Sequence, residues 1–146
     1  MGLIADTHAL VRPEALDALA GVTRIVHAGD VGAPEVLRAF ARVAPVTAVR
    51  GNNDHGAWAE RLPETARIAV GGRRVLVVHE KTHAAARTPA AGIDVVVTGH
   101  SHRPLVEWRD GVLFVNPGSP TLPMTAPGTV AILDLGPKPK AKIVKL

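Results

Sequence analysis

The stretch Val95-Val96-Val97-Thr98-Gly99-His100-Ser101-His102 joins an apolar run to a polar cluster, and this combination decides the fold. Consecutive β-branched residues are typical of a strand that is buried on both faces of a parallel sheet. Four other short apolar runs lead into polar clusters in the same way; they are Leu3–Ala5 before Asp6 and His8, Ile25–Val26 before Asp30, Val46–Val49 before Asn52 to Asp54, and Val75–Val78 before His79. Because ligands of open α/β sheets gather at the carboxyl ends of strands, we expect all five clusters at one edge.

The remaining segments predict how that sheet is covered and extended. Apolar residues recur at helical spacing over Pro13–Ala20 and Pro34–Arg42, which indicates helices packed on the sheet. In the second half turns join the strands, since Gly71-Gly72 and Asp110-Gly111 are hairpin signals between strand-forming runs. Further strands are expected at 129–135 and 141–146, with a loop at 117–128 near the polar edge. We therefore predict an α/β fold of two sheets packed face to face with helices outside.

Length and composition limit the class of protein. A chain of 146 residues that is 47% hydrophobic can bury one sizeable core, so residues 1–146 are interpreted as a single domain. No apolar run approaches the roughly 20 residues of a membrane span and no leader precedes the first strand, which favours a cytoplasmic protein without a membrane partner. With 3% aromatic residues, no stable nucleic-acid partner is expected despite a net charge of +4. No pattern predicts the oligomeric state.

The polar clusters have the composition of a metal site. Asp6-Thr7-His8 and His100-Ser101-His102 each hold two metal-binding side chains two residues apart. Residues i and i+2 of an extended strand end project to the same side, so each pair can converge on one point. The chain has no cysteine, so any metal must be held by oxygen and imidazole nitrogen. Such mixed shells suit manganese, iron, zinc or nickel better than calcium.

The order of these motifs resembles that of the calcineurin-like metallophosphoesterase superfamily, and the short length with Asn116-Pro117-Gly118-Ser119 resembles its small YfcE-type phosphodiesterase branch. The resemblance implies an αββα sandwich of two mixed β-sheets flanked by helices. It also implies two divalent metal ions per chain, with Mn²⁺ as the first expectation and Ni²⁺, Fe²⁺ and Zn²⁺ as alternatives. The implied ligands form two sets that share one carboxylate: Asp6, His8, Asp30 and His102 for one metal, and Asp30, Asn52, His79 and His100 for the other.

The same resemblance implies hydrolysis of small or nucleotide-like phosphodiesters. A hydroxide bridging two metals about 3.5–4 Å apart would attack phosphorus while the metals clamp the phosphate oxygens, with Asp30 as the shared ligand. Two alternatives remain open. One is phosphomonoester hydrolysis by the same fold, and the other is a catalytically weak metal-binding scaffold module. No pattern in the loops identifies the natural substrate.

Several positions depart from the pattern of the larger phosphatases. Where these enzymes carry a histidine in a Gly-Asn-His motif, this chain has Asn53, which can donate a hydrogen bond but cannot deliver a proton to a leaving group. His55 is the candidate replacement. Without such an acid, a contribution of about 10²–10⁴-fold is missing, which favours substrates with good leaving groups. Glu80-Lys81 replaces a Gly-His pair of the family and changes the pocket shape that the resemblance implies.

Two arginines flank the ligand motifs. Arg50 precedes Gly51 and Arg103 follows His102, so each guanidinium could contact a substrate phosphate. The alternative is a salt bridge to a carboxylate such as Asp54; both interpretations remain open for Arg50, and the salt bridge is favoured for Arg103. Asp54 itself is expected to orient a neighbour of the metals rather than to bind one.

Overall fold

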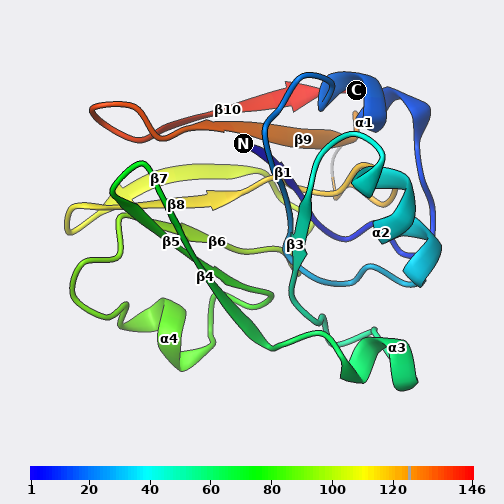
Figure 1. Ribbon diagram of the computed structural model, residues 1–146, viewed down its shortest axis with the longest axis horizontal. Coiled ribbons are helices and arrows are strands. Elements are labelled where there is room, and N and C mark those ends of the chain that lie inside the picture. Colours follow the sequence, from blue (N-terminus) through cyan, green and yellow to red (C-terminus); the bar gives the residue numbers. More distant parts are fainter. Residues whose placement is uncertain (125) are drawn as a thin grey trace.

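The computed structural model describes residues 1–124 and 126–146, and it contains two five-stranded mixed sheets with short helices outside them (Figure 1). Sheet A has the strand order β10-β9-β1-β2-β3. Its strands are β1 (Gly2–Ile4), β2 (Ile25–His27), β3 (Val46–Ala48), β9 (Thr129–Asp134) and β10 (Lys140–Lys145). The first three are parallel, and β9 and β10 extend the sheet from β1 as an antiparallel hairpin.

Sheet B has the strand order β4-β5-β6-β8-β7. Its strands are β4 (Thr65–Val70), β5 (Arg73–Val78), β6 (Val95–Val97), β7 (Leu105–Arg109) and β8 (Val112–Asn116). The three central strands β5, β6 and β8 are parallel to one another, and β4 and β7 are antiparallel edge strands. Each sheet therefore contains three adjacent parallel strands, β1-β2-β3 in sheet A and β5-β6-β8 in sheet B, and the parallel strands of each sheet all end at the same edge.

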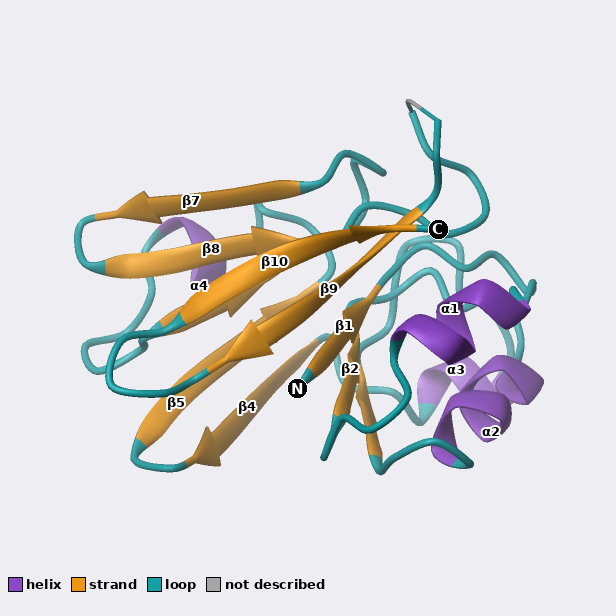
Figure 2. Cartoon of the chain, turned by 90° about the horizontal axis from the view of Figure 1, so that it is seen from above, coloured by secondary structure: helices purple, strands orange, loops and turns teal. Residues whose placement is uncertain are grey.

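The two sheets pack face to face, and their inner faces form the main core (Figure 2). Buried aliphatic residues from both sheets meet there; they include Leu3, Val26, Val77, Val97 and Val115. Helices α1 (Pro13–Ala18) and α2 (Pro34–Ala41) cover the outer face of sheet A, where Phe40 packs against Ile4 and Ile25. Helix α4 (Ala84–Arg87) packs Ala86 on the outer face of sheet B. The αββα sandwich predicted from the sequence is confirmed.

The predicted elements differ from the observed ones mainly at their ends. The helix expected over Pro13–Ala20 ends at Ala18, and the one expected over Pro34–Arg42 ends at Ala41. Both hairpins form with Gly71-Gly72 and Asp110-Gly111 in their turns. The short helices α3 (Ala57–Glu60) and α4 were not predicted, because four residues are too few to show a helical period.

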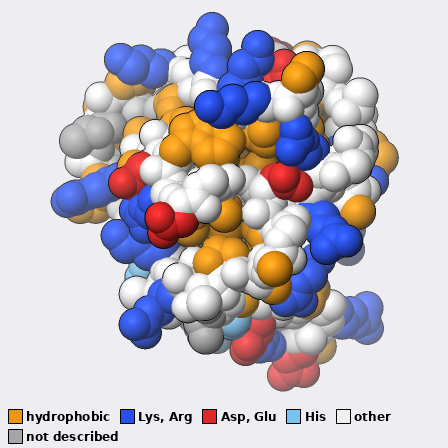
Figure 3. All heavy atoms as spheres, turned by 90° about the vertical axis from the view of Figure 1, so that its left-hand side faces the viewer, with side chains coloured by type: hydrophobic (Ala, Val, Ile, Leu, Met, Phe, Trp, Pro, Cys, Tyr) orange, Lys and Arg blue, Asp and Glu red, His pale blue; other side chains and the backbone are white. Residues whose placement is uncertain are grey.

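The hairpin turns lie at the end of the sandwich opposite the carboxyl ends of the central strands. Figure 3 shows this face, where Lys and Arg side chains surround exposed hydrophobic groups and acidic side chains are fewer. In the part of the chain that the structure describes, no helix has the length and apolar character needed to cross a membrane. The polar clusters identified in the sequence lie at the other end.

Candidate metal centre

The loops that follow β1, β2, β3, β5 and β6 meet at one edge of the sandwich. Each loop contributes at least one of the side chains implied as metal ligands. Sheet A supplies Asp6, His8, Asp30 and Asn52, and sheet B supplies His79, His100 and His102. The structure therefore brings together residues that lie as much as 96 positions apart in the sequence, between 6 and 102.

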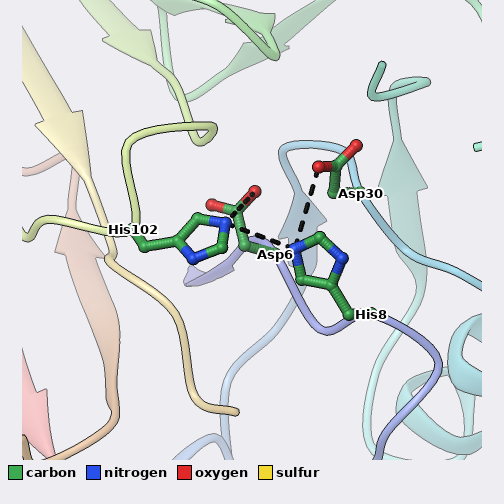
Figure 4. A group of neighbouring side chains, drawn as sticks. All are labelled: Asp6, His8, Asp30 and His102. Carbon is green, nitrogen blue, oxygen red and sulfur yellow. Dashed lines mark hydrogen bonds and ion pairs between the residues drawn. The ribbon is translucent and has the colours of Figure 1, made fainter. Parts of the chain in front are cut away.

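The first half of the centre consists of Asp6, His8, Asp30 and His102, which can each offer a ligand atom within 4.8 Å of the others (Figure 4). The Nε2 atoms of His8 and His102 face each other at 3.2 Å. His102 Nε2 lies 3.6 Å from Asp6 Oδ1, and His8 Nε2 lies 3.8 Å from Asp30 Oδ2. This arrangement offers two imidazole nitrogens and two carboxylates to one point.

The bonding of these side chains fits a cation at that point. His102 Nδ1 can only donate to the carbonyl oxygen of Leu122, at 2.7 Å, so the neutral ring presents an unprotonated Nε2 to the centre. Asp6 Oδ2 is buried and has no hydrogen-bond partner among the described residues. A buried carboxylate oxygen without a partner is costly in water-excluded surroundings, and a bound cation would remove that cost.

The second half consists of Asn52, His79 and His100. Asn52 Oδ1 lies 2.9 Å from His79 Nε2 and 3.0 Å from His100 Nδ1. His79 Nδ1 donates to the Ala28 carbonyl oxygen at 2.8 Å, so a neutral His79 would face the amide oxygen with an unprotonated nitrogen. Two acceptors this close need a proton or a metal between them, which makes this half suitable for a second cation.

Asp30 connects the two halves. Its Oδ2 faces His8, and its Oδ1 lies 3.4 Å from His79 Nε2. Burial would raise the pKa of Asp30, but hydrogen bonds from His79 and Asn53 outweigh it and hold the pKa well below its usual range. The carboxylate is therefore ionised at any physiological pH and available to both halves.

Two other pKa values reflect the concentration of charge at the site. Burial raises the pKa of Asp6 to about 6, although His79 and His102 act against it. Burial alone would lower the pKa of His79, but the hydrogen bonds to Asp30 and Ala28 outweigh it and raise the value. In the absence of a metal, protons therefore compensate part of the charge that a divalent cation would balance.

The backbone at the ligands is left-handed rather than extended. Asp6, His8, Asp30, His100 and His102 have φ values of 55°, 46°, 52°, 68° and 55°. The argument that residues i and i+2 of an extended strand end project to the same side is therefore wrong for Asp6/His8 and His100/His102. The pairs converge because the chain has already turned away from the strand, into a conformation that most residues avoid.

Two glycines allow the loops to approach each other. A Cβ atom on Gly29, where φ is 90°, would lie 2.6 Å from Nδ1 of His79. A Cβ atom on Gly51 would collide with the backbone nitrogen and the carboxylate of Asp30. Glycine at these positions is therefore required for the contact between the halves.

Asn53 and Asp54 hold the loops of the centre in place. Asn53 donates its backbone N–H to Asp30 Oδ1 at 2.8 Å and its Nδ2 to Oδ2 at 2.7 Å. Asp54 is 4% exposed and accepts hydrogen bonds from the N–H groups of Gly32 and Gly51. The observed contacts give Asn53 a direct means of orienting Asp30, and its role in catalysis stays a prediction.

His55 and Arg50 lie beside the second half rather than in it. Both line a cavity of about 660 Å³ that also contacts Asn52 and His79. Arg50 Nη2 donates to Glu64 Oε1 at 3.0 Å, so its salt-bridge partner is Glu64 and not Asp54. Their predicted roles, proton donation by His55 and phosphate binding by Arg50, stay predictions.

The sequence places His27 at a strand end as a packed residue beside the ligands, but it does not predict which groups His27 contacts beneath the first half. His27 is fully buried and donates Nε2–H to Thr7 Oγ1 at 2.9 Å, because the Thr7 hydroxyl proton is used on the Val31 carbonyl oxygen. Burial lowers the pKa of His27 to about 3, so the ring is neutral. Ser119 Oγ donates to the Asp6 carbonyl oxygen at 2.8 Å. For Ser119 the signal in the sequence was its place in the loop at 117–128, which follows a strand of sheet B.

A family model described as the calcineurin-like phosphoesterase superfamily domain matches residues 1–138. The chain belongs to this superfamily, as its motifs predicted. A probable metallophosphoesterase of Methanothermobacter thermautotrophicus is 33% identical, in an alignment that covers 99% of this chain and 91% of that protein. A phosphodiesterase of Methanocaldococcus jannaschii, MJ0936, is 26% identical over 99% of this chain and 98% of its own length.

Solved structures agree with the fold. An archaeal phosphodiesterase superposes with a TM-score of 0.85 at 24% identity, covering 99% of this chain and 98% of that chain. The phosphoesterase YfcE from E. coli superposes with a TM-score of 0.69 at 26% identity, covering 92% of this chain and 89% of that chain. Family and fold together support a phosphoesterase with metal-binding residues at the observed edge.

Proposed function

We propose that this chain is a phosphodiesterase that uses two divalent metal ions, with manganese as the first candidate. The observation that carries the proposal is the position of Asp30 between two groups of ligand-type side chains. A carboxylate at that point can be shared, since each oxygen faces a different histidine. Two bound cations would supply an activated water and charge stabilisation for in-line displacement at phosphorus.

The chain's own residues define what else the site can do. Asn53 directs its backbone N–H and its Nδ2 at Asp30, and the exposed His55, the first proton donor predicted from the sequence, lines the adjoining cavity. His83, a weaker candidate for this role from the sequence, lines the same cavity. A good leaving group departs from a diester without such a proton. This favours such diesters over alkyl monoesters as substrates. A small phosphodiester is therefore the proposed substrate class.

The test is hydrolysis of bis(p-nitrophenyl) phosphate and of p-nitrophenyl phosphate by metal-stripped protein refilled with Mn²⁺. We expect faster turnover of the diester, and a loss of more than about 10³-fold in Asp30→Asn, which exceeds the 10²–10³-fold typical of one stabilising donor. The metal content of Asp30→Asn, measured on the same samples, should be lower than two ions per chain. Faster turnover of the monoester would contradict diester specificity.

A metal-binding protein without catalysis is the second candidate. It is favoured if the refilled protein binds metal but hydrolyses neither ester with Mn²⁺, Ni²⁺, Fe²⁺ or Zn²⁺. The buried, unpaired oxygen of Asp6 is compatible with both candidates, because it requires a cation and not a reaction.

A further inference from the structure

A second cavity, of about 530 Å³, lies on the outer face of sheet B and carries only basic charged side chains. Lys81, Arg103 and Arg109 line it, together with Ser101, Phe114 and further residues without charge. We call it the basic cavity. Its volume is in the range of small-molecule sites in proteins, which runs from about 300 to 1,000 Å³.

The strand register explains how the basic cavity is built. Leu105 lies opposite Asn116 in the β7–β8 pair, and Arg109 lies opposite Val112. Residues on one face of a strand alternate with period two, so Leu105 and Arg109 share the face that carries Phe114. From Leu105 to Arg109 the strand advances about 13 Å. Glu107 lies on this face as well, opposite Phe114, and pairs with Arg109. The floor is therefore formed by Leu105 and Phe114, with the Glu107–Arg109 ion pair beside them and towards its far end.

The basic cavity also reaches the metal centre. Ser101, which lines it, lies between the predicted ligands His100 and His102, and consecutive Cα atoms are about 3.8 Å apart. Arg103 follows His102 directly. Thr98 is 6% exposed and lines the same cavity. Polar groups thus continue from the metal centre into the cavity.

The three cations differ in how far they are already neutralised. Arg109 donates Nε–H to Glu107 at 2.9 Å, and its Cζ lies 5.0 Å from the centre of the Phe114 ring. The side chains of Arg103 and Lys81 take part in no ion pair among the described residues. Arg103 and Lys81 therefore hold the positive charge that an anionic ligand would meet first.

The cavity on the other side of the centre has the opposite character. Glu60, Glu64 and Glu80 line the 660 Å³ cavity, and its Arg50 is paired with Glu64. The boundary between the two cavities falls between adjacent residues, because Glu80 lines the 660 Å³ cavity and Lys81 lines the basic cavity. A diester bound at the metals could thus direct its two substituents into unlike surroundings.

We propose that the basic cavity is a subsite for a second phosphate group, carried by the substituent that stays on the phosphorus after hydrolysis. This inference rests on the proposed phosphodiesterase function and names its substrate class: nucleotide-like diesters that bear a further phosphate. The sugar and base would lie over Leu105 and Phe114, and the second phosphate would contact Arg103 and Lys81. In the reaction, water adds to phosphorus and the alcohol on the other side departs with its oxygen.

The test compares two substrates that break the same bond. One is the p-nitrophenyl ester of thymidine 5′-phosphate, and the other is the same compound with a 3′-phosphate. With Mn²⁺-loaded protein at low salt, we expect kcat/KM to be about tenfold higher for the 3′-phosphorylated substrate, equivalent to about 1.4 kcal/mol. The preference should decrease several-fold at high ionic strength, because exposed charges are screened.

Substitutions in the basic cavity show which side chains cause the preference for the 3′-phosphorylated substrate. Lys81→Gln and Arg103→Gln should each reduce the ratio of the two kcat/KM values several-fold. Arg67→Gln is the matched control, because it removes an exposed arginine from β4 at the opposite edge of sheet B, and the ratio should not change. If wild-type protein hydrolyses both substrates with equal kcat/KM, or if all three variants behave alike, the subsite is refuted while the phosphodiesterase function stands.

A binding measurement separates the two proposals if neither substrate is hydrolysed. Calorimetric titration with thymidine 3′,5′-bisphosphate and thymidine 5′-monophosphate needs no turnover. Tighter binding of the bisphosphate that is lost in Lys81→Gln would support the basic cavity although the phosphodiesterase proposal had failed. Equal affinity for the two nucleotides would overturn the cavity proposal as well.

Discussion

The two halves of the metal centre share Asp30 but differ in charge and burial. The first half adds a second carboxylate, Asp6, which is completely buried, and a His102 side chain that is 19% exposed. The second half has, besides Asp30, only the neutral amide of Asn52 as an oxygen ligand. Its His100 side chain is 48% exposed. A divalent cation is held more strongly by two buried carboxylates than by one shared carboxylate and an amide. The first half should therefore be the tighter site.

The largest effect that can test this comparison comes from removing one histidine in each half. Wild-type protein should bind two Mn²⁺ per chain with two affinities. His100→Gln should leave the tight site intact and remove the weak one, whereas His8→Gln should weaken the tight site. Each variant should lose about 10²–10³-fold in diester turnover, similar to the loss of a charge-stabilising group. Calorimetric titration of metal-stripped protein gives both affinities. Loss of the tight site in His100→Gln would contradict the assignment of the tighter site to the first half.

A smaller effect is expected from Asn53, which reaches both oxygens of the shared carboxylate. Asn53→Ala removes the Nδ2 hydrogen bond and leaves the backbone one. Partners of metal ligands typically contribute 10–100-fold to metal affinity, so we expect weakening of about this size in both halves. Metal titration of Asn53→Ala beside His55→Ala, a neighbouring exposed control, measures it. Weakening confined to one half would mean that Asn53 does not act through Asp30.

The third effect is on stability rather than on metal affinity and concerns His27, which supports the first half through Thr7. Its pKa in the folded chain is about 3, below the usual 6.5, because the ring is buried. The contribution of neutral His27 to the free energy of unfolding is thus present above pH 6.5. It is lost by about 1 kcal/mol per pH unit as the pH falls from 6.5 towards 3. Asp6, with its raised pKa, acts in the opposite direction in metal-free protein.

Thermal unfolding of metal-free wild type and His27→Gln between pH 7.5 and 4.5 isolates the histidine. Glutamine can still donate to Thr7 but cannot be protonated, so the loss of Tm with acid should be shallower in the variant. Parallel curves would show that His27 does not control acid stability. Asp6 is present in both proteins, so its contribution cancels in the comparison.

The sequence predicted where the ligands lie but not how the chain presents them. Runs such as Val95–Val97 are short but entirely β-branched, and the rule that strand ends share an edge brought Asp6 and His102 together correctly. The rule of alternating side chains failed at the same residues, because they lie in loops with positive φ. Local patterns carry strand identity, whereas loop conformation depends on contacts with distant residues.

Partners that lie far apart in the sequence also escaped prediction. Arg50 pairs with Glu64 across a loop and a helix, and His102 is oriented by a backbone carbonyl, that of Leu122, which has no residue-specific signature. The hairpins, in contrast, were predicted because Gly71-Gly72 and Asp110-Gly111 determine their own turns. Prediction succeeded for turns and for the common edge of the strand ends, and it failed for contacts between particular loop residues.

The left-handed backbone at five ligands restricts the residues that could ever replace them. Apart from glycine, Asp, Asn and His are the types most tolerant of this conformation, and they are also oxygen or nitrogen ligands. Glutamate could bind a metal but resists the backbone, and glycine accepts the backbone but binds nothing. A related sequence that loses the metal should therefore show glycine at Asp6, Asp30 or His102 more often than glutamate, and an alignment of such sequences would reveal the loss of the metal from these positions.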